Sequence, residues 1–462
     1  MMQIAYHLSA WLLQRLPVRL ARRCAKPDVA GSVAAFTGAS LTEPALQLLV
    51  DVSVIYQSDA RTGIQRVVRS LLLQLLQAPP AGYRVCPIFA TRQHGYRYAA
   101  PSFLEQPAQV PDAAGEPVHA EVQTQSGDLF LGLDLAAHLL PRHQAQVLRW
   151  KKSGVNVHVV VYDLLPLQHP EWFNPRTTRN FKRWVKWLAM YADSAICISE
   201  TVKLELRTWL SASFGLPSTA LPASTIVLGA DIDASAPSGG LPANAKFLLA
   251  RLRTTPSVLM VGTLEPRKGY DQALAAFEQL WQQQGTSTLL VIVGRPGWKT
   301  EALQEKLRKH PQANKRLFWL DGVSDEYLAH LYAACRGVLV ASRAEGFGLP
   351  LIEAALHGKP VLARNLPVFR EIEVTGLTYF NSDTPQGLAS AITSWLQPAS
   401  LSGTLLEPGR ATPRFPTWQL SATQLLHALN LQHHAPSPHA ATAAEGCVGA
   451  STFNSSPPGS AA

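Results

Sequence analysis

The segment 342–353 constrains the fold more than any other part of the chain, because it sets two carboxylates eight residues apart around a glycine-rich turn. The apolar run 337–341 before it predicts a buried parallel strand, and Pro350 suits the first turn of a helix, where a missing N–H costs nothing. The segment is therefore predicted to be a strand, a loop and a helix. Gly346 and Gly348 would let the backbone approach an anion, and the unpaired N–H groups of the helix would bind a diphosphate.

The two acids of this segment suit different tasks. Glu353, which we expect in the first helical turn, would accept hydrogen bonds from both hydroxyls of a ribose. Glu345, held in the loop, would face sugar hydroxyls or the positive charge that develops at an anomeric carbon. The alternative is that Glu345 is a solvated loop residue and that Glu353 only complements the helix dipole.

A second strand–loop–helix unit, residues 258–271, carries adjacent cations in its loop. Arg267 offers a planar fork for phosphate oxygens and Lys268 a compact charge, so the pair would neutralise a pyrophosphate leaving group. An exposed Arg-Lys pair alone means little. Two loops suited to anions at the carboxyl ends of strands in one sheet, however, indicate a site for a nucleotide-sugar.

These motifs, with VIVGRPGW and LDGVSDEYLAHLY between them in family order, resemble the retaining glycosyltransferases of the GT-B fold. The resemblance is to the large family with an E-x7-E motif that includes many bacterial mannosyltransferases, and it covers about residues 46–431. It implies an α/β fold of two Rossmann-like βαβ domains with a cleft between them. It also implies that Arg267 and Lys268 hold the donor diphosphate. Glu345 would then contact the transferred sugar, and Glu353 the ribose.

The resemblance extends to residues with weaker motifs. Gly322 and Val323 match the place where the base is bound through backbone groups, and Thr62-Gly63 matches a glycine loop that approaches the donor phosphate from the amino-terminal side. The alternative for Gly63 is a simple turn glycine. The implied donor-binding residues are Gly63, Arg267, Lys268, Gly322, Val323, Glu345, Gly346, Phe347, Gly348, Leu349 and Glu353.

The acceptor side is predicted in the segment 160–173, which follows an apolar strand into the cleft. Tyr162 stands where many family members have a histidine that contacts the donor sugar, so it keeps a hydrogen-bonding tip and loses the imidazole. Asp163 would orient a hydroxyl or act as a weak base, and its alternative is a turn-forming Asp after a strand. His169, before Pro170, is a further candidate, with a structural role as the favoured alternative. The predicted catalytic residues are Glu345, Arg267, Lys268 and Asp163.

Alternating strand and helix patterns predict parallel βα units. The first core strand is expected at 46–52, followed by a helix over 67–76, with further strands at 128–133, 155–162, 195–199 and 225–228. We expect an amphipathic extension over 1–45, an acceptor-side domain over 46–233, a linker over 234–250, a nucleotide-sugar domain over 251–431 and a disordered tail over 432–462.

Length, composition and cysteine spacing indicate the number of domains and the cellular compartment. A chain of 462 residues with 47% hydrophobic residues can fill two cores, and no apolar run reaches the 18 or so residues of a membrane span. The five cysteines are scattered, without C-x-x-C spacing, which favours a reducing cytosol and argues against a zinc site or a disulfide framework. We expect a cytoplasmic protein without a metal or other cofactor.

The net charge of +9 implies anionic partners, yet the basic residues do not form a nucleic-acid motif. They gather in two amphipathic segments, 4–26 and 176–186, which would let the protein sit on anionic lipid at the inner face of the cytoplasmic membrane. The alternatives are surface helices whose aromatic faces pack on the core, favoured for 176–186, and, for the first segment, a transit peptide.

The sequence thus predicts a hexosyltransferase that moves mannose from GDP-mannose to a sugar hydroxyl of a lipid-linked or surface polysaccharide. The expected route is a front-face displacement that needs no metal, because cations and helix N-termini stabilise the leaving diphosphate. Alternatives are another activity of the same cleft, such as a nucleotide-sugar epimerase or a phosphorylase, and a non-catalytic sugar-binding assembly partner.

Overall fold

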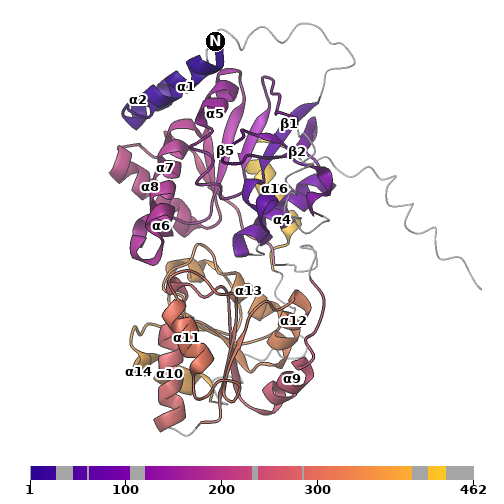
Figure 1. Ribbon diagram of the computed structural model, residues 1–462, viewed down its shortest axis with the longest axis vertical. Helices are drawn as coiled ribbons and strands as arrows, with labels where there is room; N and C mark the ends of the chain where they lie inside the picture. The colour runs from indigo at the N-terminus through magenta and orange to yellow at the C-terminus, as the bar shows by residue number, and fades with distance from the viewer. Residues whose placement is uncertain are drawn as a thin grey trace, which may run out of the picture.

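The computed structural model describes residues 2–27, 45–59, 62–104, 120–230, 238–283, 286–397 and 415–432. Its strands form two sheets, and Figure 1 shows each in its own half of the molecule, with helices on both faces. Every pairing between neighbouring strands is parallel except that of β2 with β3. The chain is therefore a mixed α/β protein with two parallel sheets, as the sequence predicts. The predicted disordered tail lies outside the described residues from 433 onward.

The amino-terminal sheet has the order β3-β2-β1-β4-β5-β6-β7. Its strands are β1 (Leu46–Asp51), β2 (Tyr83–Phe89), β3 (Arg97–Tyr98), β4 (Leu129–Gly132), β5 (Asn156–Val161), β6 (Ser194–Cys197) and β7 (Ala223–Thr225). Its helices are α1 (Met2–Leu13), α2 (Val18–Cys24), α3 (Ser53–Gln57), α4 (Gly63–Gln77), α5 (Gln144–Lys152), α6 (Leu165–Gln168), α7 (Pro175–Tyr191) and α8 (Glu200–Phe214), with 3₁₀ turns η2 (Pro101–Leu104) and η3 (Pro170–Trp172).

The carboxyl-terminal sheet has the order β10-β9-β8-β11-β12-β13. Its strands are β8 (Ser257–Val261), β9 (Leu289–Val293), β10 (Leu317–Leu320), β11 (Gly337–Val340), β12 (Val361–Arg364) and β13 (Leu377–Phe380). Around it lie α9 (Ala245–Thr254), α10 (Tyr270–Gln283), α11 (Glu301–Lys309), α12 (Asp325–Ala334), α13 (Leu349–Leu356) and α14 (Pro385–Trp395), with turns η5 (Pro266–Lys268) and η6 (Pro367–Glu371). The last described helix is α16 (Trp418–Ala428).

The predicted strands agree with β1, β4, β5 and β6 within one or two residues, and three differences remain. The strand expected at 225–228 is β7, which ends at Thr225. We did not predict β2, which contains Pro87 where a strand disfavours proline. The helix α9 begins inside the expected linker 234–250, because Leu248 and Leu249 are buried in the core of the carboxyl-terminal half.

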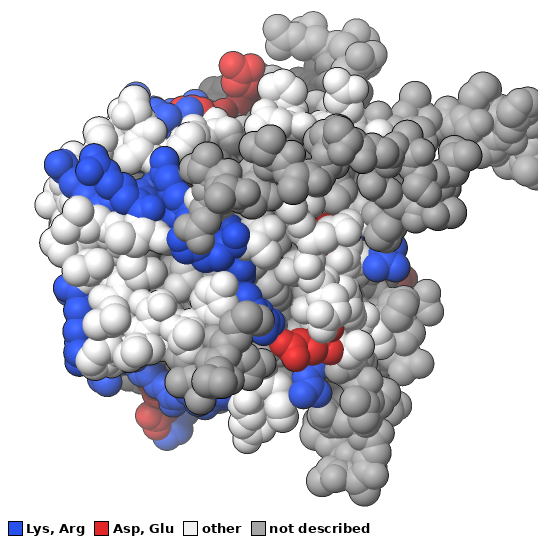
Figure 2. Space-filling model, turned by 90° about the horizontal axis from the view of Figure 1, so that it is seen from above, with Lys and Arg blue, Asp and Glu red and all other residues white. Residues whose placement is uncertain are grey.

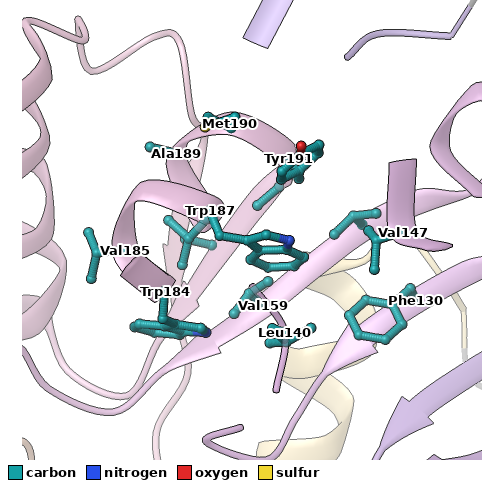
Figure 3. Close-up of a cluster of buried hydrophobic side chains, with 14 of the residues drawn as sticks. Phe130, Leu140, Val147, Val159, Trp184, Val185, Trp187, Ala189, Met190 and Tyr191 are labelled. Carbon is teal, nitrogen blue, oxygen red and sulfur yellow. The ribbon is translucent and has the colours of Figure 1, made fainter. Parts of the chain in front are cut away.

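The basic helix α7 buries an aromatic face, as the favoured alternative for it predicts. Figure 3 shows Trp184 and Trp187 lying over Val159 of β5, with Phe130 of β4 beside them. Trp184 and Trp187 are at most 2% exposed, and the exposed positions of the helix include all its cations except Lys186, which is half-buried. Burying large aromatic side chains is the strongest contribution that one helix can make to a core.

The helices α1 and α2 are separated at Pro17 and pack against the amino-terminal half, so they are part of it rather than a separate extension. Ala10, Leu13, Val18 and Ala21 are buried in the same cluster as the aromatic face of α7. Arg22 reinforces the contact, since its Nη1 donates to the carbonyl oxygens of Ala189 and Ala192 at 3.0 and 2.7 Å.

The last helix, α16, returns to the amino-terminal half and packs on α4, as Figure 1 shows by its yellow colour in the upper half. Trp418 is 1% exposed within the core cluster that contains Leu48 and Val50 of β1. Gln424 adds a polar contact, with its Oε1 accepting from Val227 N at 2.8 Å. The prediction of one domain over 251–431 therefore assigns α16 to the half on which it does not pack.

Replacing Trp418 by Ala is expected to lower the free energy of unfolding by about 3–5 kcal/mol, because it leaves a cavity in the core of the amino-terminal half. Leu420→Ala on the same helix is the control, since Leu420 is 43% exposed and its loss should cost little. Urea unfolding of both variants provides the measurement. Equal losses in the two variants would show that α16 does not depend on this buried face.

Candidate functional site

The carboxyl-terminal sheet reverses its strand order at the neighbouring strands β8 and β11, and this reversal brings two loops together. Loops that follow adjacent parallel strands leave the same edge of the sheet, where α/β proteins bind their ligands. Gly269, at φ 70°, follows η5 in the loop after β8, and a Cβ there would lie 2.3 Å from the carbonyl oxygen of Ala341. A glycine at this position therefore lets the cations of η5 lie beside the loop after β11.

Glu345 is the centre of a buried ion cluster in these loops. Its Oε2 accepts from Arg267 Nη1 at 2.5 Å, and its Oε1 accepts from Lys268 Nζ at 2.5 Å and from Ser342 Oγ at 2.8 Å. Arg267 Nε also donates to Glu265 Oε2 at 2.7 Å. The side chain of Glu345 is only 9% exposed, so the alternative of a solvated loop residue is wrong. The structure thus brings together the three charged residues that the two loop motifs contribute.

The cations determine how the acids of this cluster ionise. Burial acts to raise the pKa of Glu345, but the charges of Arg267 and Lys268 outweigh it and lower the pKa to about 2. Burial raises the pKa of Asp163, and the Arg267 charge opposes that rise. Glu345 is therefore a fixed carboxylate at neutral pH, while Asp163 takes up a proton more readily than an ordinary aspartate.

Glu353 lies on α13 and is the fifth residue of that helix, so the expectation that it occupies the first turn is wrong. The helix begins at Leu349, directly after the glycine-rich turn, so Pro350 lies in its first turn as predicted. Tyr332 OH donates to Glu353 Oε2 at 2.7 Å, and Arg66 Nη1 donates to Oε1. A carboxylate that is 8% exposed and held by two partners has more than the role of complementing a helix dipole.

The two glycines of the turn allow close contacts with other parts of the protein. A Cβ on Gly346 would lie 2.0 Å from the carbonyl oxygen of Tyr162 in the other half, and Ser199 Oγ donates to the Gly346 carbonyl at 2.9 Å. A Cβ on Gly348 would lie 2.8 Å from the ring of Phe369. A side chain at either position would therefore collide with neighbouring protein atoms, and the predicted approach of these glycines to an anion stays a prediction.

The remaining predicted donor residues lie around this contact. Phe347 and Leu349 pack against the core cluster of the amino-terminal half, and Gly63, the first residue of α4, lies opposite, since a Cβ on it would be 3.8 Å from Leu349 Cδ1. Gly322 and Val323 lie in the loop between β10 and α12. The space next to Gly322 is open, and Val323 packs at the edge of the carboxyl-terminal core.

The three acceptor-side candidates lie in different environments. Tyr162 is 2% exposed and its OH donates to the carbonyl oxygen of Leu133 at 2.8 Å, so its hydroxyl faces the core and the predicted acceptor contact through it is wrong. The ring continues the buried face of β5, which the sequence pattern did not reveal. Asp163 forms the turn that its alternative predicts, with Oδ1 accepting from Leu165 N at 3.1 Å. It also lies against Gly346, so it is at the contact between the two halves.

His169 lies farther along the same loop. Its ring stacks on Trp172 with centroids 3.9 Å apart, and its Nδ1 is 3.1 Å from Glu171 Oε1. The carbonyl oxygen of Trp172 in turn accepts from Trp298 Nε1 of the carboxyl-terminal half at 2.9 Å. These contacts support the structural role that we favoured for His169.

The sequence predictions missed several residues that complete the site. Arg66 and Tyr332 hold Glu353, and Ser199 holds Gly346 across the cleft. Glu371 of η6 also crosses it, accepting from the backbone N of Glu200 and Thr201 at 2.7 Å. Only Arg66 had a sequence signal, its position just after the predicted Thr62-Gly63 loop.

Within the described ranges, no group of three or more His, Cys, Asp or Glu side chains is placed to hold a metal ion. Cys24, Cys86, Cys197 and Cys335 are free thiols there, and no helix in this part of the chain is long and apolar enough to span a membrane.

The comparisons with known proteins agree with the fold. Residues 246–405 match the family model described as "Glycosyl transferases group 1". The structure of Anabaena HepE in complex with UDP and glucose superimposes with a TM-score of 0.56 at 18% identity, over 84% of this chain and all of that one. The chain therefore has the GT-B fold, and residues 246–405 form a group 1 glycosyl transferase domain.

Two curated relatives are mannosyltransferases of Escherichia coli. The serotype-specific mannosyltransferase WbdA is 43% identical over 385 residues, which are 83% of this chain and 45% of WbdA. The O-antigen chain mannosyltransferase B is 27% identical over 306 residues, 63% of this chain and 78% of that protein. The chain thus spans slightly less than half the length of WbdA.

The low pKa of Glu345 predicts how its contribution to stability depends on pH. A carboxyl whose pKa falls from 4.5 unfolded to about 2 folded stabilises the native state above pH 4.5, by about 3 kcal/mol, and this stabilisation falls as the pH drops towards 2. Glu345→Gln should therefore lower the free energy of unfolding at pH 7 and have a smaller effect at pH 3. Chemical denaturation at both values measures this, and a difference that stays constant with pH would contradict the buried ion cluster.

Proposed function

We propose that this protein is a retaining mannosyltransferase that moves mannose from GDP-mannose to a sugar hydroxyl of a lipid-linked or surface polysaccharide precursor. The observation that carries the proposal is the buried cluster in which Arg267 and Lys268 meet at Glu345, at the strand-order reversal of the nucleotide-binding type of sheet. Mannose and an O-antigen type of acceptor are supported by the names of the two E. coli relatives.

The proposed step is a displacement on one face of the sugar. The bond between the anomeric carbon and the diphosphate oxygen breaks while the acceptor oxygen bonds to the same carbon from the same side. The acceptor proton passes to the leaving phosphate. Lys268 and Arg267 stabilise the charge on the diphosphate, and Glu345 faces the positive charge that develops on the sugar ring.

The remaining predicted residues have proposed roles in binding the ribose, the base and the acceptor. We propose that Glu353 accepts from the ribose hydroxyls and that the loop with Gly322 and Val323 receives the base through its backbone. Asp163 lies beside Gly346, so it would orient the acceptor hydroxyl. No metal is required in this proposal, because charge on the diphosphate is met by side-chain cations.

The experiment is transfer of mannose from GDP-mannose to a polysaccharide-precursor acceptor in the presence of EDTA, compared between the wild type and Lys268→Ala. EDTA should leave the rate unchanged. Loss of Lys268 should lower turnover by about 100-fold, because a charge-assisted contact that strengthens in the transition state is removed. Melting curves should show a much smaller effect on stability.

The control is Lys309→Ala in the same half, since that side chain is 77% exposed and its ion pair lies within α11. It should keep the wild-type rate. If Lys268→Ala kept at least half of that rate, we would abandon the diphosphate site. If GDP-mannose gave no transfer while another nucleotide-sugar did, the donor assignment would be wrong and the site would stand.

We also propose that the amino-terminal half docks on an anionic membrane through the face formed by α1 and α2, here called the α1–α2 face. It combines an exposed apolar stripe with cations, and Leu8, Trp11, Leu12 and Leu20 are 58%, 47%, 49% and 49% exposed. Apolar residues at i, i+3 and i+4 form one side of a helix, which is how an interfacial helix inserts.

The charges of the neighbouring helices favour an anionic surface. The described parts of α1, α2, α5 and α7 contain no Asp or Glu, whereas Arg19, Arg23 and Lys26 are exposed on or just after α2. Further exposed cations lie on α7, which packs against α2, at Arg176, Arg179, Lys182 and Arg183. Figure 2 views this end of the molecule and shows a band of Lys and Arg with few acids beside it. Each such cation near the surface contributes about 1 kcal/mol.

Sedimentation with vesicles tests this docking. The wild type should pellet with vesicles that contain anionic phosphatidylserine or phosphatidylglycerol and remain in solution with neutral ones, and added salt should reduce pelleting. Trp11→Gln combined with Leu12→Gln should reduce it at least several-fold without unfolding the protein, because neither side chain is in the core. Leu204→Gln, on α8 and 67% exposed, is the control. Unchanged pelleting of the double variant would exclude the α1–α2 face.

A further inference from the structure

Arg66 of the amino-terminal half reaches the carboxylate that we propose as the ribose ligand in the other half. Its Nη1 donates to Glu353 Oε1, and its Nη2 lies 3.4 Å from Asp325 Oδ1 on α12. The Arg66 side chain is 24% exposed and that of Glu353 is 8% exposed. The ion pair therefore lies at the contact between the two halves, largely shielded from water, where a charged pair is strong and the loss of one partner is costly.

The start of α4 fixes the position of this arginine. Thr62 caps the helix in a reciprocal capping box with Gln65, whose Nε2 also donates to the carbonyl oxygen of Ser58 at 2.6 Å. Gly63 lies against Leu349 at the start of α13. Arg66 follows on the first turn, so the capped helix end and the apolar contact hold its side chain towards α13.

Glu353 keeps acceptor positions beyond those that its two partners use. A carboxylate offers about four acceptor positions, two on each oxygen. Arg66 bonds to one oxygen and Tyr332 OH donates to the other at 2.7 Å, which leaves a position on each oxygen for a hydroxyl donor. The charge of Glu353, the main influence on Arg66, raises the pKa of that guanidinium, so the arginine remains a cation beside it.

We propose that Arg66 is a positioning residue of the ribose site, supplied by the half that does not otherwise bind the nucleoside. It keeps Glu353 oriented, so that the carboxylate presents its remaining acceptor positions to the two ribose hydroxyls. Binding of the nucleoside thereby depends on contact between the two halves. This inference rests on the proposed ribose-binding function of Glu353.

The test is a calorimetric cycle with GDP and 2′,3′-dideoxy-GDP, in which the arginine and the hydroxyls are removed separately and together. Arg66→Met should weaken GDP binding by about 10-fold, the usual loss for one hydrogen bond to a charged group. The same substitution should change the affinity for 2′,3′-dideoxy-GDP by less than about two-fold, because no ribose hydroxyl remains to be positioned. Arg66→Lys should recover part of the GDP affinity.

Arg69→Met is the matched control. Arg69 lies one turn farther along α4, and its guanidinium bonds to Asp59 and to the carbonyl oxygen of Leu104, all within the amino-terminal half. It should leave the ratio of the two affinities at the wild-type value. The same cycle run with UDP and its dideoxy analogue covers the case in which the base is not guanine.

The outcomes separate the inference from the function on which it rests. If the wild type binds the two members of each pair equally, the ribose role of Glu353 fails and the inference fails with it. If the wild type prefers the ribose form and Arg66→Met keeps that preference in full, the function stands and the inference is overturned. Tighter GDP binding by Arg66→Met would also overturn it, because Arg66 would then be a competitor that the ribose displaces.

Discussion

The buried ion cluster of Glu345 with Arg267 and Lys268 is the interaction on which the proposed chemistry depends. It joins the loops after β8 and β11, which meet because the strand order reverses there. Gly269 makes that meeting possible by its close approach to Ala341. Removing Glu345 would leave two cations without their shared partner, whereas removing Lys268 leaves Glu345 paired with Arg267. The cluster therefore keeps its cations in place before any donor arrives, and such preorganisation lowers the cost of stabilising a leaving diphosphate.

The two halves share one site. The loop that carries Glu345 contacts the other half at Gly346, and the residues on either side of Gly348 pack on the amino-terminal core. Arg66 crosses in the opposite direction to Glu353. Such crossing contacts make donor binding and the arrangement of the halves parts of one equilibrium, because a ligand held by both halves favours the state in which they touch. The exposed α1–α2 face lies on the amino-terminal half, so docking on a membrane would orient that half.

Patterns that act locally could be read from the sequence, and contacts across the cleft could not. The apolar runs of β4, β5, β6 and β11 predicted strands, and the paired loop motifs predicted the ion cluster, because strand periodicity and adjacent charges are local properties. The inward hydroxyl of Tyr162 and the protein partner of Gly346 depend on how two distant segments pack.

The central claim is that Arg267 and Lys268 receive the donor diphosphate while Glu353 receives the ribose. A crystal structure of the protein with bound GDP tests it most directly. We expect phosphate oxygens of the bound GDP within about 3 Å of Lys268 Nζ and the Arg267 guanidinium. Both ribose hydroxyls should lie within hydrogen-bond distance of Glu353. A diphosphate bound elsewhere, with Glu345 still holding both cations as in the free protein, would contradict it.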